Sequence, residues 1–259
     1  MSSDNIIGVN LFSVRDYCKT EDDLNRTLEK IAGMGYPSVQ VSGVGDIPAE
    51  RIKRVVDSHG LTVCATHENL DTLTNRTAEA IEKLKVFDAT YCALGSPGTD
   101  YLRPGGARDL ADTFREPAEQ FAAAGCSLGF HNHHREFERF EKDTFMDVFL
   151  RETDGTPVNL ELDVHWVMRG GVSPEVFIAE HGARVGAIHI KDFAIDAGEP
   201  VFAEVGEGNL NWDGILDACR SHGISMFIVE QDKPRAVRDI FSSLEISLQN
   251  MRGMGLLKE

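Results

Sequence analysis

Short apolar runs alternate with amphipathic helical patterns about eight times along this 259-residue chain. Glycines recur where a helical pattern ends and the next apolar run begins, and no Gly/Ser/Pro-rich linker divides the chain. Ionisable residues gather at the C-terminal ends of the apolar runs, whereas small residues precede them. These observations predict one α/β domain over residues 1–259, a (β/α)8 TIM barrel, in preference to an open doubly wound sheet with fewer strands.

The apolar runs are rich in β-branched residues and bounded by glycine or polar residues, which is typical of strands. We predict strands at 6–12, 38–41, 61–66, 90–94, 126–131, 158–163, 185–190 and 224–230. Helical periodicity predicts helices at 21–32, 48–59, 75–87, 107–124, 143–152, 173–181 and 212–222, with a last helix from about 235 to 251.

Capping signals support these boundaries. Thr20 precedes three acidic residues at 21–23, which is a favourable helix start. Gly60, Gly125 and Gly223 each come between a helical pattern and a strand. A helix often ends at a residue in the left-handed conformation, which glycine adopts without strain. We therefore expect these three glycines to end their helices.

The composition argues against several classes of function. The formal net charge of -16 opposes extended contact with a nucleic-acid backbone, which is bound through Lys and Arg. No apolar run approaches the length of a membrane span, and no signal peptide is visible. The five cysteines are scattered, odd in number and never in a CxxC pair. We expect a cytoplasmic protein without nucleic-acid or membrane partners. The composition is compatible with either a monomer or a homo-oligomer.

Four consecutive predicted strands end in residue types that bind metals. The strand at 126–131 leads into His131 and His133, and the next three end with Asp163, His189 and Glu230. Since the C-terminal ends of barrel strands meet at one face, we expect these side chains to surround one divalent ion. The mixed nitrogen and oxygen set favours Mn²⁺, Co²⁺ or Zn²⁺ over Mg²⁺. His131 and His133 both face inward if alternate residues share a face, and only one need be a ligand.

Further side chains near these strand ends are candidates for contact with a substrate. Lys191 follows His189 by two residues, so it faces the same interior and either contacts the substrate or pairs with a carboxylate. Trp166 offers an apolar wall to a sugar face, or simply packs. His67 follows the third strand and Arg15 the first.

Several motifs carry a resemblance to a known family. They are Gly8–Arg15 (GVNLFSVR), Phe130–His133 (FHNH), Leu162–Asp163, Ile188–Asp192 (IHIKD) and Val205–Trp212 (VGEGNLNW). Over nearly its whole length the chain resembles the sugar phosphate isomerase/epimerase group of xylose-isomerase-like barrels, relatives of D-tagatose 3-epimerase and inosose dehydratase. The resemblance implies a metal bound by one residue from each of the last four strands, here His131 or His133, Asp163, His189 and Glu230.

One departure from that pattern affects the expected reaction. The tagatose epimerase type has a glutamate acid/base at the fifth strand end, where this chain has histidine, and Glu136 follows a few residues later. We expect a metal-dependent isomerase or epimerase of a small keto sugar or cyclitol, working through an enediolate. Glu230, His131 and Lys191 are the catalytic candidates, and Glu136 is a substrate-binding candidate.

Three other functions are compatible with the same barrel. The first alternative is a metal-dependent lyase or dehydratase of a keto-inositol or 3-keto-glycoside. An endonuclease IV-like phosphodiesterase would resemble a three-zinc site with a basic DNA face, which this acidic chain lacks. A non-catalytic sugar-binding barrel would need no stoichiometric metal. The strand ends carry no evident Arg/Lys cluster, which favours an unphosphorylated substrate.

Overall fold

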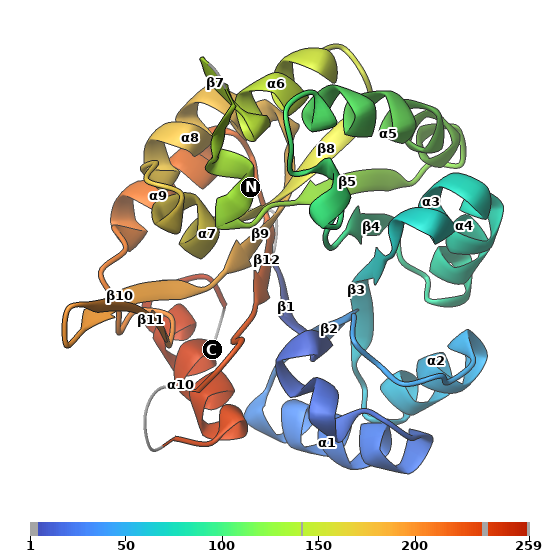
Figure 1. Cartoon of the computed structure of the whole chain (residues 1–259). Helices are drawn as coiled ribbons and strands as arrows, with labels where there is room; N and C mark the ends of the chain where they lie inside the picture. Colours follow the sequence, from blue (N-terminus) through green and yellow to red (C-terminus); the bar gives the residue numbers. More distant parts are fainter. Residues whose placement is uncertain (1–4, 141, 235–237, 258–259) are drawn as a thin grey trace.

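The computed structural model describes residues 5–140, 142–234 and 238–257. Eight parallel strands close into a barrel in the order β1-β12-β9-β8-β5-β4-β3-β2. Helices form an outer ring around it (Figure 1), so the predicted single-domain TIM barrel is confirmed. The barrel strands are β1 (Ile6–Asn10), β2 (Ser38–Val41), β3 (Thr62–Glu68), β4 (Tyr91–Leu94), β5 (Ser127–His131), β8 (Val158–Asp163), β9 (Val185–Ile190) and β12 (Met226–Val229).

The helices of the ring agree with the predicted ones to within a few residues, except at the start of the last, where residues 235–237 lie outside the described chain. Two short helices, α3 (Leu70–Asn75) and α7 (Val164–Arg169), were not predicted. No helix among the described residues is long and apolar enough to cross a bilayer. The ring comprises α1 (Glu21–Met34), α2 (Ala49–Ser58), α4 (Thr77–Val86), α5 (Gly106–Ala123), α6 (Phe145–Glu152), α8 (Pro174–His181), α9 (Trp212–Ser221) and α10 (Ile240–Gly253).

The predicted caps are present. The Thr20 side chain accepts from the backbone N–H of Asp23, whose carboxylate accepts from the backbone N–H of Thr20, which forms a capping box at the start of α1. Gly60, Gly125 and Gly223 have φ angles of 69°, 74° and 70°. This is the left-handed region, so glycine turns the chain here from helix toward strand at little steric cost.

An apolar floor fills part of the barrel interior. The Tyr91 hydroxyl donates to the carbonyl of Leu160 at 3.0 Å. A Cβ on Gly129 would lie 2.3 Å from the Tyr91 hydroxyl, and one on Gly186 would lie 2.4 Å from its ring, so this tyrosine requires glycine on both strands. The floor is formed by Cys64, Ala65, Tyr91, Ala93, Ala187 and Ile228.

Alternation along β8 separates the apolar core from the polar interior. Leu160 and Leu162 belong to the main core shared with the helices. Glu161 and Asp163, both 0% exposed, point to the other face, into the barrel. The polar residues above the floor therefore lie at the C-terminal ends of the strands.

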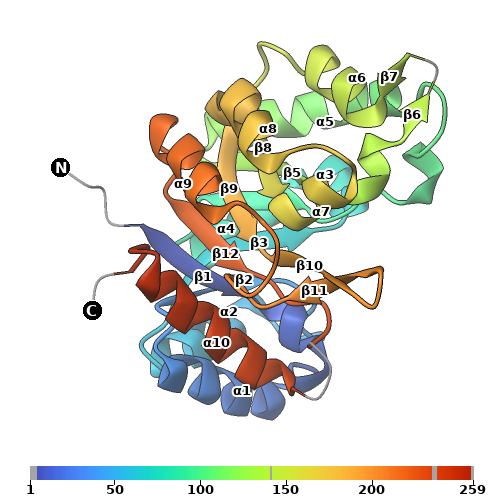
Figure 2. The same ribbon diagram turned by 90° about the vertical axis from the view of Figure 1, so that its left-hand side faces the viewer.

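A hairpin that the sequence did not predict lies over this end of the barrel. It consists of β10 (Asp192–Asp196) and β11 (Glu199–Ala203), and Figure 2 shows it at the end opposite the start of β1. The buried carboxylate of Asp192 accepts from the backbone N–H groups of Gly206 and Gly208 and from the Trp212 indole. A Cβ on Gly208 would lie 2.1 Å from Asp192 Oδ1. The glycines of the segment 205–212 thus let the backbone wrap a buried carboxylate beside the site.

Candidate active site

Four predicted metal ligands converge above the floor. His131 ends β5, Asp163 ends β8, His189 lies on β9, and Glu230 follows β12. Each offers one ligand atom, and these four atoms all lie within 4.8 Å of one another. The side chains are between 0% and 5% exposed. We call these four residues the upper set.

The upper set fits a divalent ion. Asp163 Oδ2 and His131 Nδ1 are buried, and their nearest polar partners are ionic contacts with Lys191 Nζ at 3.0 Å and Glu161 Oε2 at 3.1 Å, outside hydrogen-bonding geometry among the described residues. A carboxylate oxygen has two lone pairs and a neutral imidazole has one, so both atoms retain a lone pair for a ligand. Burial, with the neighbouring His189, lowers the pKa of His131 to about 4, so its imidazole is neutral at pH 7. Two carboxylates with two imidazoles are a donor set for Mn²⁺, Co²⁺ or Zn²⁺.

Lys191 supplies a positive charge beside the upper set. Its Nζ lies 3.0 Å from Asp163 Oδ2, 2.8 Å from Glu230 Oε2 and 2.7 Å from Asp232 Oδ2. Burial would lower the pKa of Lys191, but these carboxylates outweigh burial and raise it above its usual range. The ammonium therefore stays charged, and it lies 5.2 Å from the centre of the Trp166 ring. Sequence reasoning had not included Asp232 in the site.

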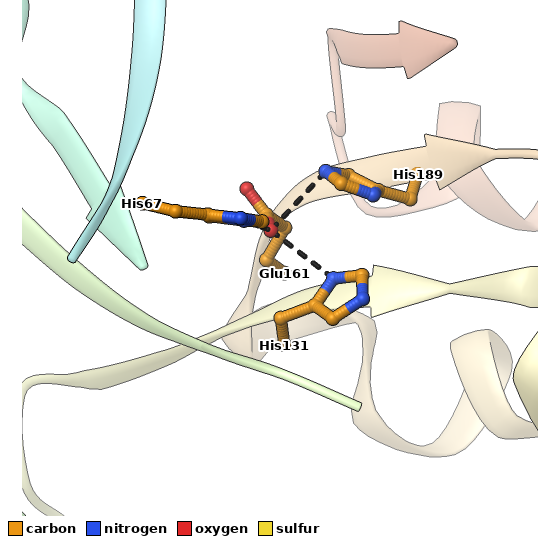
Figure 3. A group of neighbouring side chains, drawn as sticks. All are labelled: His67, His131, Glu161 and His189. Atoms are coloured by element: carbon orange, nitrogen blue, oxygen red, sulfur yellow. Dashed lines mark hydrogen bonds and ion pairs between the residues drawn. The ribbon is translucent and has the colours of Figure 1, made fainter. Parts of the chain in front are cut away.

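Glu161 is a central residue that the sequence analysis missed. His67 Nε2 makes a hydrogen bond with its Oε2, and Gln40 Nε2 donates to its Oε1 at 2.6 Å. His131 Nδ1 and His189 Nε2 lie 3.1 Å and 3.2 Å from the same Oε2. Figure 3 shows the three imidazoles directed at this carboxylate. His67, His131, Glu161 and His189 form a second metal-capable group, which we call the lower set.

Strand periodicity could have found Glu161. It precedes Asp163 by two residues on β8, so a predicted inward Asp163 implies an inward Glu161. A charged side chain at such a position is rarely buried without partners. Glu161 lies one layer of side chains below the strand end, whereas the predicted site residues lie near or beyond the strand ends.

The two sets share His131 and His189, and hydrogen bonding distinguishes them. Both Glu161 oxygens already have protein donors, whereas Asp163 Oδ2 has no hydrogen-bond partner within the described chain. His189 Nδ1 faces Glu230 Oε2 at 3.1 Å, and its Nε2 lies 2.8 Å from Gln40 Oε1. A metal-binding histidine commonly has its second nitrogen held by such an oxygen. This arrangement favours the upper set as ligands, with Glu161 as support.

His133 differs from His131 in backbone position. Strand β5 ends at His131, so the alternation argument does not extend to His133, which instead precedes the 3-10 turn at His134–Phe137. Its backbone N–H donates to Glu136 Oε2 at 2.8 Å. Burial, with the neighbouring His131, lowers the pKa of His133 to about 2, and burial raises the pKa of Glu136. His133 still lines the cavity but belongs to neither metal-capable group.

A cavity of about 710 Å³ opens above the upper set. Of the predicted substrate contacts, His67, Glu136 and Trp166 line it. Arg15 does not, because its guanidinium donates to the Phe12 carbonyl at 2.8 Å and stacks on the Phe12 ring. The lining residues include Phe12, Ser42, His67, Glu68, Asn69, Ser96, Thr99, Leu102, His131, His133, His134, Arg135, Glu136, Trp166, Glu230 and Asp232.

Comparison with known proteins assigns the family. A family model described as xylose isomerase-like TIM barrel matches residues 28–245, most of the chain. The chain belongs to this family. No significant match is found among curated proteins.

Several solved structures share this fold. A sugar phosphate isomerase/epimerase from Parabacteroides distasonis is 23% identical with a TM-score of 0.82, covering 99% of this chain and 96% of that one. L-ribulose 3-epimerase is 17% identical (TM-score 0.70; coverage 96% and 94%). The Escherichia coli 3-keto-D-glucoside 4-epimerase is 16% identical (TM-score 0.71; coverage 96% and 99%). At these identities the likeness establishes the xylose isomerase-like fold alone.

Proposed function

We propose that this chain is a divalent-metal-dependent isomerase or epimerase of a small keto sugar or cyclitol, working through an enediolate. The observation that carries the proposal is the convergence of the upper set within 4.8 Å at the buried end of a cavity. Its fold relatives include enzymes named as epimerases of sugars. The free cysteines fit the reducing cytoplasm, which we include in the proposal.

The ion would be held by His131, Asp163, His189 and Glu230. Mn²⁺, Co²⁺ or Zn²⁺ suits these donors better than Mg²⁺. Bound there, it supplies Lewis acidity that polarises a substrate carbonyl and the neighbouring hydroxyl. Glu161 and Gln40 hold the two histidine rings in orientation from below.

The protein residues would then move the proton. Glu230 Oε1 accepts from Asn10 Nδ2 at 3.1 Å, which fixes the carboxylate at the cavity as the general base. Lys191, which lies behind Glu230 and is not among the lining residues, is proposed to stabilise negative charge that develops on a substrate oxygen. His133 lines the same cavity without joining the ligand group, and its neutral imidazole is proposed to hydrogen-bond the reacting part of the substrate.

Trp166, His67 and Glu136 are proposed to contact the substrate. The indole of Trp166 presents an apolar surface to a sugar face, while His67 and Glu136 offer polar atoms to its hydroxyls. Arg15 is not among the lining residues, and we propose that it acts through Phe12, whose ring it holds at the cavity.

The test is a screen for α-proton exchange. The Mn²⁺-loaded protein is incubated in D₂O with ketoses and inososes, and loss of the α-proton signal is followed by NMR. Exchange in at least one substrate, absent from the metal-stripped protein, is the expected result. Failure of every keto sugar and cyclitol to exchange, together with the absence of stoichiometric metal in the purified protein, would favour a non-catalytic sugar-binding barrel.

A metal-dependent lyase is the second candidate. It is favoured by histidine, in place of glutamate, at the end of β5, because a pair of opposed glutamates is then missing. The same NMR spectra separate the two reactions. An epimerase gives a product of unchanged composition, whereas a dehydratase gives new olefinic or deoxy signals.

A further inference from the structure

The cavity above the upper set is larger than one sugar ring requires. A hexose has about 12 non-hydrogen atoms, and even at the ~30 Å³ that a water molecule occupies in the liquid it fills no more than about 360 Å³. The cavity measures about 710 Å³. About half of the space is therefore left when one ring lies against the ligands.

The two ends of the cavity differ in burial. His131 and Glu230 at the inner end are 3% and 5% exposed. Asn69, Ser96 and Thr99 at the outer end are exposed. His134 and Arg135, which also line the cavity, are exposed as well. The inner end thus offers the reactive groups, and the outer end offers mainly hydroxyl, amide and imidazole groups, with one cation, to a part of the ligand that does not react.

The outer end suits a neutral polyol. The side-chain oxygen of Asn69, Oδ1, accepts from the Thr72 backbone N–H, which leaves the side-chain nitrogen Nδ2 to donate to a ligand. Phe12, which is 36% exposed and braced by Arg15, presents an aromatic ring. Aromatic faces and neutral hydrogen-bonding groups together recognise the apolar faces and hydroxyls of a sugar.

The charge of the lining argues against a phosphate in that space. Arg135 is the one Lys or Arg among the described lining residues. Four carboxylates share the cavity with it, but Glu68 pairs with Lys83 at 2.6 Å, and Glu230 and Asp232 pair with Lys191 at 2.8 Å and 2.7 Å. Within the described lining, these pairs leave one cation, Arg135, against one carboxylate, Glu136, so there is no surplus of positive charge to bind a phosphate dianion. The carboxylates are Glu68, Glu136, Glu230 and Asp232.

We propose that the substrate is a neutral glycoside of two-ring size. Its keto ring lies at the upper set, and its second ring lies between Phe12 and the loop that carries Ser96 and Thr99. This inference rests on the proposed function for the reaction at the inner end. It adds the size and charge of the part that does not react.

A binding measurement tests the proposed substrate size and charge independently of turnover. Isothermal titration of metal-loaded protein compares 3-ketoglucose, 3-ketosucrose and 3-ketoglucose 6-phosphate. We expect the disaccharide to bind about tenfold more tightly than the monosaccharide, and the phosphate to bind no more tightly. Equal affinity for one and two rings, no binding of any of the three, or a preference for the phosphate that Arg135→Gln removes would each overturn the proposal.

A variant pair locates the second ring. Ser96→Trp fills the outer end, whereas Asp100→Trp places the same side chain four residues away on an exposed position outside the cavity lining. Ser96→Trp should abolish the tenfold advantage of 3-ketosucrose and leave 3-ketoglucose unchanged, while Asp100→Trp should change neither. A loss of affinity for both ligands in Ser96→Trp would place the second ring elsewhere. Absence of α-proton exchange with disaccharide binding intact would overturn the proposed function alone.

Discussion

Glu161 and Asp163 lie two residues apart on β8, and both are fully buried, yet their partners differ. Glu161 accepts from Gln40 and His67 and has two further imidazoles near one oxygen. Asp163 Oδ2 has Lys191 Nζ 3.0 Å away but no hydrogen-bond partner among the described residues. The Glu161 carboxylate is thus surrounded by protein donors and supports its neighbours, whereas Asp163 Oδ2 has an ionic contact with Lys191 and retains a lone pair for a ligand.

The largest expected effect comes from removing a member of the upper set. Asp163→Ala and His189→Ala should lower metal content from about one ion per chain to near none, because each removes a donor atom from a four-ligand site. Inductively coupled plasma mass spectrometry after dialysis measures occupancy, and circular dichroism checks the fold. Full metal occupancy and activity in either variant would show that the altered residue is no ligand.

Glu230→Gln tests the general base within the same set. Amide replacement keeps the size but removes basicity, so we expect α-proton exchange to fall about 10²–10⁴-fold even at saturating metal. The measurement is the NMR exchange rate across a metal titration. If excess metal restores nearly the wild-type rate, Glu230 is only a ligand, and the base is another group of the site.

Substitution of His131 and of His133 should affect different properties of the enzyme. His131→Gln should lose metal, because His131 belongs to both metal-capable groups. His133→Gln should keep the metal and lose turnover by about 10²-fold, as expected when a positioned hydrogen-bonding group at the reacting atoms is removed. Metal content and exchange rate are measured on both proteins. Equal metal loss would make both histidines ligands, and no effect in either would remove this segment from the site.

The smallest effect is expected from Glu161→Gln, the counterpart of an Asp163→Asn change on the same strand. Loss of a carboxylate that orients metal-binding histidines typically costs about 10–100-fold in metal affinity, so the ion should still bind at higher concentration. Titration with Mn²⁺, followed by electron paramagnetic resonance, compares the two variants. Metal loss as complete in Glu161→Gln as in Asp163→Asn would identify the lower set as the ligands.

Hydrophobic periodicity and glycine caps were enough to predict all eight barrel strands and the ring of helices. Both are local signals, since a strand buried on both faces needs a continuous apolar run and a helix end needs a left-handed residue. The same reasoning predicted that His131, Asp163, His189 and Glu230 lie together, because parallel strands in a barrel end at one face. The hairpin at Asp192–Ala203 escaped prediction since its polar ends read as a loop.

The sequence alone determined which strand ends carry metal-binding residue types, because burial pattern and strand direction follow from neighbouring residues in the chain. Only the tertiary structure decided which of those groups is already satisfied. Glu161 meets Gln40 from β2 and His67 from β3, and Arg15 turns toward Phe12 and away from the cavity. The two Glu161 pairings join residues 121 and 94 positions apart, and no local pattern encodes a hydrogen bond made across the interior of a closed barrel.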